Sequence, residues 1–257
     1  MTPIEAYDDT SERARTFLAY HDGLINIRSR RIRKDWKASF LKLMHWPYTS
    51  AIERVDSKDA VIVLREGASL TPDHFTQPWL DDQLRAALTF GVSALDRYVH
   101  ERVVKGIIPA LKDMPLTRQQ EEFSIPVSVA IQISEEAVAA QKRGLKIRPA
   151  NIVRKKVQEL LHKKPFQSYR EIEYAFNLLG VKDLAKQLQT AYGVGDLKAF
   201  KSQLAGIAMR RNQIVHEGDL VRHERGGQVK WHEINRKYVA DSLDFLDTFV
   251  GHLENVV

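Results

Sequence analysis

The sequence contains no cysteine among its 257 residues. That absence excludes disulfide bonds, cysteine-ligated zinc, iron–sulfur clusters and a thiol nucleophile. Long hydrophobic runs are also missing, because the uninterrupted apolar stretches are short, such as residues 60–64, and none approaches the roughly 20 residues of a membrane span. The opening residues, Met-Thr-Pro-Ile-Glu, lack the apolar stretch of a secretory signal. We therefore expect a cytoplasmic protein that does not associate with membranes.

The positive charge is modest in total but unevenly distributed. Lys and Arg number 39 and Asp and Glu 33, which gives a net charge of +6. Residues 28–37 hold six basic and one acidic side chain, and residues 142–164 hold nine basic and one acidic. These two windows together carry +13, so the rest of the chain carries −7. A mildly acidic body with two strongly basic segments indicates a polyanion partner, and nucleic acid is the first candidate. The simpler alternative is that these side chains only solvate helix faces.

RNA is the partner that we expect at the two basic windows. The predicted contact residues are Arg30, Arg31, Arg33 and Lys34 in the first window and Arg154, Lys155 and Lys156 in the second. Aromatic residues lie nearby, including Trp36 and Phe40, and could stack on bases. We favour core positions for them.

Apolar residues recur at helical spacing along most of the chain. The pattern predicts helices over residues 10–25, 33–44, about 78–105, 127–140, 149–163, 168–179, 181–192 and 196–216, and one after Asn235. Residues 60–64 resemble a strand but have no evident partner nearby. The stretch 221–231 alternates around a Gly-Gly pair, which favours a small β-hairpin. The expected fold class is all-α, a helical bundle.

The chain length suits one large domain with an appendage. We expect residues 1–70 to form a basic, helical N-terminal extension. Residues 71–257 would form the main helical domain, with a basic insertion around residues 115–165.

The segment most suggestive of chemistry is residues 210–219, Arg-Arg-Asn-Gln-Ile-Val-His-Glu-Gly-Asp. On an ideal helix, Arg211 falls in the middle of an apolar stripe that includes Leu204 and Ala208. A guanidinium there must be paired or must face a partner surface. We expect the backbone near the helix end to turn His216 toward the same cleft, with Gly218 as the helix breaker.

This combination of side chains can cleave RNA without a metal. Arg211 could stabilise an anionic phosphorane, and His216 could move protons. Asn212 could hydrogen-bond His216, a ribose or a phosphate. The simpler alternative is a chance spacing in which Arg211 forms a structural ion pair.

The segment from Arg211 to His216 resembles the motif of the HEPN superfamily, an Arg followed after a polar-led spacer by His. The flanking Arg210 and residues 217–219, with the upstream stretch 91–101, resemble the RiboL-PSP-type branch, and the resemblance spans roughly residues 75–255. It implies an all-α homodimer with a composite Arg–His site and no cofactor. The implied activity is that of a metal-independent endoribonuclease in toxin–antitoxin or antiviral defence, with an antitoxin or defence-system partner. The alternative is a non-catalytic HEPN-type module that binds RNA or a partner.

Three further residues are expected to support this site. Arg210 flanks the motif, and Asp96 and His100 are spaced i,i+4 on a long predicted helix. A local helix pair is the simpler interpretation of Asp96 and His100. We expect no metal, because His216, His223 and His232 do not have a helix-based zinc-ligand spacing.

Overall fold

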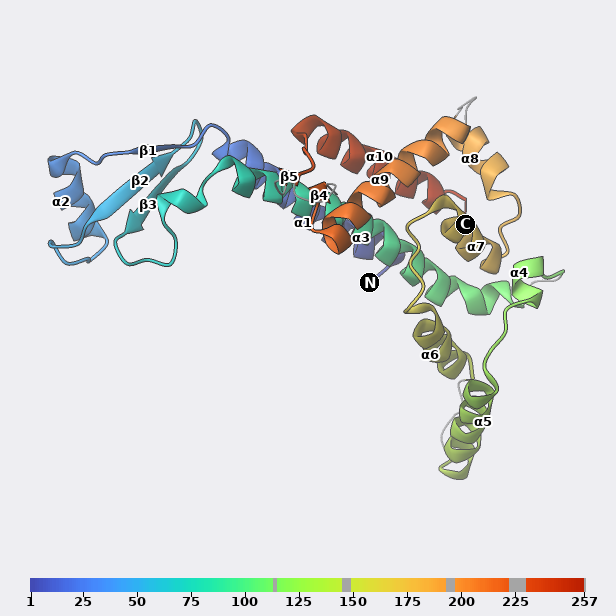
Figure 1. Cartoon of the computed structure of the whole chain (residues 1–257). Helices are drawn as coiled ribbons and strands as arrows, with labels where there is room; N and C mark the ends of the chain where they lie inside the picture. Colours follow the sequence, from blue (N-terminus) through green and yellow to red (C-terminus); the bar gives the residue numbers. More distant parts are fainter. Residues whose placement is uncertain (113–114, 145–148, 193–196, 222–229, 257) are drawn as a thin grey trace, which may run out of the picture.

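A long central helix, α3 (Gln77–Ala110), organises the fold (Figure 1). The computed structural model describes residues 1–112, 115–144, 149–192, 197–221 and 230–256. Helix α3 has Pro78 in its first turn, where the missing N–H is tolerated. Its predicted stripe is buried along the whole length, from Leu84 through Leu88 and Val92 to Val99. The expectation of a long helix from about residue 78 is confirmed.

Helix α1 (Pro3–Leu24) runs beside α3, and α9 (Leu197–Glu217) and α10 (Arg236–Glu254) cover another side of it (Figure 1). The hydroxyl of Tyr7 donates to Asp247 at 2.6 Å, and so ties α1 to α10. At Gly91 a Cβ atom would overlap Leu243, so α10 approaches α3 closely only because glycine is there. The core is therefore shared by helices from both ends of the chain.

The remaining helices lie toward the C-terminal half of α3. They are α4 (Arg118–Glu121), α5 (Val127–Lys142), α6 (Pro149–Leu161), α7 (Tyr169–Leu178) and α8 (Leu184–Tyr192). Helices α6 and α7 pack on α3, whereas α5 projects away from the bundle and contributes no fully buried side chain (Figure 1). The part of the chain that the structure describes has no helix that is both long and apolar enough to span a bilayer.

A three-stranded antiparallel sheet lies beyond the N-terminal end of α3 (Figure 1). Its strands are β1 (Arg28–Arg30), β2 (Ile52–Asp56) and β3 (Val61–Arg65) in that order, with α2 (Lys34–Leu43) between β1 and β2 and the short η1 (Pro72–His74) after β3. The predicted helical fold class is confirmed for most of the chain, but the strand-like residues 60–64 have partners, so the fold also contains a small sheet. The partners were missed because β1 and β2 are short and polar and do not alternate like a strand with one buried face.

The N-terminal 70 residues do not form one helical extension. Helix α1 belongs to the bundle, with Tyr7, Ala14 and Leu18 in the core, and only residues 28–70 stand apart as a sheet with one helix. We call residues 28–70 the sheet module. At the other end of the chain, β4 (Leu220–Val221) pairs antiparallel with β5 (Lys230–Trp231), as the hairpin prediction required. The Gly-Gly pair between them lies outside the described residues.

Candidate functional site

Helix α9 carries the Arg–Asn–His motif in its last two turns. Phe200, Leu204, Ile207 and Ala208 are buried along its first part, and the stripe then rises toward the surface. Arg211 continues this stripe and is half-buried. Its Nε atom is buried and has no hydrogen-bond partner among the described residues, while its Nη1 donates to Asn212 Oδ1 at 3.1 Å. Arg211, which interrupts the apolar pattern of the helix, is therefore a partly buried guanidinium with one N–H donor that no described residue satisfies.

His216 does not turn toward Arg211 in the way that we expected. Helix α9 continues through Glu217, so His216 is still helical and lies about 140° around the axis from Arg211. Asn212 and His216 are spaced i,i+4 instead and are both exposed, so they share a solvent-facing side. The expected breaker is confirmed at Gly218, whose φ is +62°, but the chain leaves the helix only after His216.

A buried ion cluster fixes the end of α9. Asp219 is only 1% exposed and has a φ of +59°. Its carboxylate accepts from both Nη atoms of Arg210, and from Nε of Arg85 on α3 at 2.5 Å. The two arginines also donate to the backbone carbonyls of Glu233 and His232, at 3.2 and 3.1 Å. The cluster therefore joins α3, the end of α9 and the segment after β5.

The charge state of Asp219 follows from these contacts. Burial by itself would raise the pKa of its carboxyl group, but the hydrogen bonds and charges of Arg210 and Arg85 outweigh burial and hold the pKa below its ordinary value. Arg210 thus supports the motif structurally, by anchoring the helix that carries it. Sequence reasoning missed Arg85, although a basic residue next to Leu84 of the apolar stripe of α3 could have indicated a buried partner.

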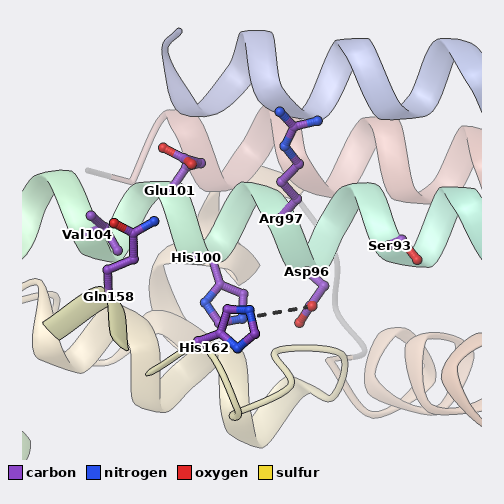
Figure 2. Close-up of a pocket in the computed structure, with 8 residues that line it drawn as sticks. All are labelled: Ser93, Asp96, Arg97, His100, Glu101, Val104, Gln158 and His162. Carbon is purple, nitrogen blue, oxygen red and sulfur yellow. Dashed lines mark ion pairs between the residues drawn. The ribbon is translucent and has the colours of Figure 1, made fainter. Parts of the chain in front are cut away.

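Asp96 and His100 lie elsewhere, in a pocket of about 270 Å³ between α3 and α6 (Figure 2). Asp96 is about 16 Å farther along α3 than Arg85, and no residue of the 210–216 segment lines the pocket. Figure 2 shows the Asp96 and His100 side chains extending from α3 toward His162, with Asp96 Oδ2 3.9 Å from His100 Nε2. The expectation that this pair supports the Arg–His motif is therefore not met.

The contacts in this pocket are those of a helix junction. Asp96 Oδ1 accepts from the backbone N–H of Phe166 at 2.5 Å, and the His100 ring packs edge-on against the Phe166 ring at 4.7 Å. Arg97 points away toward α1, where it donates to Asp9 at 2.9 Å. Among the described residues no group of three His, Cys, Asp or Glu side chains could hold a metal ion. His223, considered above for zinc, lies outside the described residues.

The predicted RNA-contact residues fall on two distant surfaces. Arg31, Arg33 and Lys34 are exposed in the sheet module, where Arg30 lies 3.5 Å from Asp56. In α6, Lys155 is exposed, Lys156 pairs with Glu159 at 3.0 Å and Arg154 donates to Asn151. The sheet module and α6 lie at different ends of α3, so the basic windows do not form one continuous surface (Figure 1).

Searches with this chain found no matching family model, curated protein or solved structure.

Proposed function

We propose that this chain is a metal-independent endoribonuclease of the HEPN type, which acts as a homodimer through Arg211, Asn212 and His216. The observation that carries the proposal is the half-buried Arg211 at an exposed helix end, whose Nη1 bonds Asn212 and whose Nε has no partner in the part of the chain that the structure describes. An unsatisfied buried donor is costly unless a ligand or a partner surface satisfies it. A phosphate group suits a guanidinium because its oxygens can accept two parallel N–H bonds.

The way in which α9 presents the motif supports a dimer. One helix holds Arg211 and His216 about 140° apart around its axis, so a single chain does not direct both at one phosphate. Met209 and Val215, next to the motif, are 61% and 45% exposed. Around the helix axis, Val215 lies about 40° from Arg211 and Met209 about 20° from His216. A second copy packed across the end of α9 would cover both apolar side chains, and would set the Arg211 of one chain against the His216 of the other.

The proposed reaction is an internal transesterification. His216 takes the proton of a ribose 2′-OH, the 2′-oxygen bonds to the adjacent phosphorus, and the bond from phosphorus to the 5′-oxygen breaks. The leaving oxygen takes up a proton, which gives one fragment with a 5′-OH and one with a 2′,3′-cyclic phosphate. Arg211 stabilises the extra negative charge of the phosphorane, and Asn212 holds the Arg211 guanidinium in place.

The direct test is cleavage of single-stranded RNA in EDTA. We expect 2′,3′-cyclic phosphate ends, and a loss of about 10²–10⁴-fold in rate for His216→Ala and for Arg211→Ala. Arg13→Ala is the matched control, because Arg13 is an exposed arginine on another helix that pairs only with Asp9 among the described residues. Cleavage that survives both substitutions would move the active site elsewhere. Toxicity on expression, relieved by His216→Ala, would support a role in defence.

Mixing the two inactive variants tests the composite site. If each site takes Arg211 from one chain and His216 from the other, a mixed dimer contains one intact site. An equimolar mixture that exchanges subunits should then regain roughly a quarter of wild-type activity, since half of random pairs are mixed and each has one of two sites. No recovery, although co-purification of two differently tagged variants shows mixed dimers, would place both residues of a site on one chain.

A second candidate function is a non-catalytic binding module. The observation that favours it is the projecting helix α5, where Val127, Ile131 and Val138 are all exposed. An exposed apolar helix face is typical of a surface that a partner covers. Under this alternative the purified chain would cleave no RNA, and substitution of His216 would change nothing measurable.

A further inference from the structure

The sheet module contains a row of three aromatic side chains. Trp36 stacks on Phe40 with ring centroids 5.2 Å apart and planes 22° apart, and Phe40 meets Trp46 edge-on at 5.7 Å. Trp36 is 40% exposed, so the core position that the sequence suggested for it is wrong. An indole that is held by a neighbour and is still partly exposed offers a surface on which a base can stack.

An arginine from the sheet lies at each end of this row. The guanidinium carbon of Arg54 lies 6.0 Å from the Trp36 ring, and that of Arg65 lies 5.6 Å from the Trp46 ring. The register pairs Arg54 with Val63 and Arg65 with Ile52, so both arginines project from the same face of the sheet. Arginine planes stack on bases as well as on indoles, so the row has stacking groups along its whole length.

There is open space beside the row and unneutralised positive charge in the same module. A hollow of about 460 Å³ adjoins Trp46 and is lined by Arg65, Ser69 and Leu70 among others, a volume within the usual range of ligand sites. In the part of the chain that the structure describes, Arg31, Arg33 and Lys34 are exposed and have no ion-pair partner. Such cations suit a phosphate backbone.

We propose that the sheet module binds single-stranded RNA, by stacking bases on Trp36 and Trp46 while Arg31, Arg33 and Lys34 contact the phosphates. The choice of RNA rests on the proposed function, whereas the stacking geometry does not depend on cleavage. A duplex is a poor ligand for this surface because its bases are already stacked on one another. The module lies beyond the N-terminal end of α3, so it would hold a strand outside the helical bundle (Figure 1).

The test measures binding without cleavage. Full-length chain carrying His216→Ala is titrated, in EDTA, into a fluorescently labelled 12-nucleotide oligouridine, and anisotropy gives the Kd. We expect Trp36→Leu in this background to weaken binding roughly tenfold, as the loss of one base-stacking contact does. Trp36→Phe should retain most of the affinity because it keeps an aromatic face. The matched control is Trp231→Leu, which removes an indole that is 61% exposed in β5, and it should change Kd less than twofold.

Two further measurements identify the ligand class. Arg31→Gln should reduce the slope of log K against log salt by about 0.7, the value for one phosphate contact on a single strand. A duplex of the same length should bind more weakly, and Trp36→Leu should not affect its binding. Equal effects of Trp36→Leu and Trp231→Leu, an unchanged Kd in Trp36→Leu, or displacement of the RNA by anionic vesicles would overturn the proposal. Because the tested chain lacks His216, a failure of the proposed cleavage would leave these results unchanged.

Discussion

Replacing Asp219 with asparagine removes the negative charge that Arg85 and Arg210 share, leaves Arg85 its exposed partner Asp82, and changes almost no volume. The left-handed backbone at this position, with φ of +59°, is one that asparagine adopts as readily as aspartate. The substitution Asp219→Asn therefore leaves the turn after α9 possible and tests the contribution of the charge alone.

The expected loss of stability follows from burial. Asp219 is 1% exposed, and removing one partner of a buried ion pair costs about 3–5 kcal/mol. Both guanidiniums keep some contact with solvent, with side chains 12% exposed, and asparagine still offers one acceptor oxygen. We therefore expect the lower end of the range, about 3 kcal/mol, which for a chain of this size lowers Tm by about 6–12 °C.

The assay is denaturant unfolding at pH 7, followed by circular dichroism. Asp241→Asn is the matched control, because Asp241 forms an exposed i,i+4 pair with Lys237, and its loss should cost at most about 0.5 kcal/mol. If Asp219→Asn cost no more than this control, the cluster would not be what anchors α9 to α3.

The same cluster predicts a pH dependence. The pKa of Asp219 is lowered in the folded protein because the two arginines outweigh the effect of burial. Its stabilising contribution should therefore be fully present above the ordinary aspartate pKa of about 3.9, and lost as the pH falls through the lowered folded value. The stability difference between wild type and Asp219→Asn should be constant from about pH 5 to pH 8 and should shrink below about pH 4. A difference that grew on acidification would contradict the assignment.

Two further predictions concern packing. Gly91→Ala should lower stability by about 1–3 kcal/mol in thermal unfolding, because its Cβ would overlap Leu243, whereas Gly206→Ala should raise stability by about 0.5–1 kcal/mol, because nothing lies within 4 Å of that position in α9. The two Gly→Ala substitutions should therefore change stability in opposite directions, and a change in the same direction would contradict this reasoning. Asp96→Ala should cost about 1–3 kcal/mol by leaving the Phe166 N–H without its acceptor. Asp96→Asn, which keeps an oxygen at that place, should cost less, and equal losses would refute the role of this bond.

Helical periodicity was sufficient for the bundle but not for the sheet. The long apolar stripe of α3 is buried as the spacing predicted, because a helix with one apolar face is stabilised when that face packs against the core. Strand β1 is three residues, Arg-Ser-Arg, all exposed, and carries no hydrophobic signal at all. Its place in the sheet depends on backbone pairing with β2, which side-chain pattern does not encode.

The candidate site shows the same division between local and long-range information. The half-buried position of Arg211 and the break at Gly218 follow from helix geometry and local residue types. The role of Arg210 depended on Asp219 folding back and on Arg85, which lies more than a hundred residues away in the sequence. Asp96 and His100 share a helix with Arg85, but sequence spacing along that helix does not show which neighbouring helix covers each turn.

The position of His216 is the most consequential difference from expectation. Had the helix ended before His216, one chain could have closed its own site, and the surface around the motif would need no partner. Because α9 continues through Glu217, the Arg and the His face different directions, and the exposed Met209 and Val215 lie on the same stretch of helix. The Arg210–Asp219–Arg85 cluster ties the end of this stretch to α3, so a change at the helix end would break buried ion pairs. The proposed second chain would bring its own Arg211 or His216 to the phosphate, and the mixing experiment distinguishes this arrangement from a site formed by one chain.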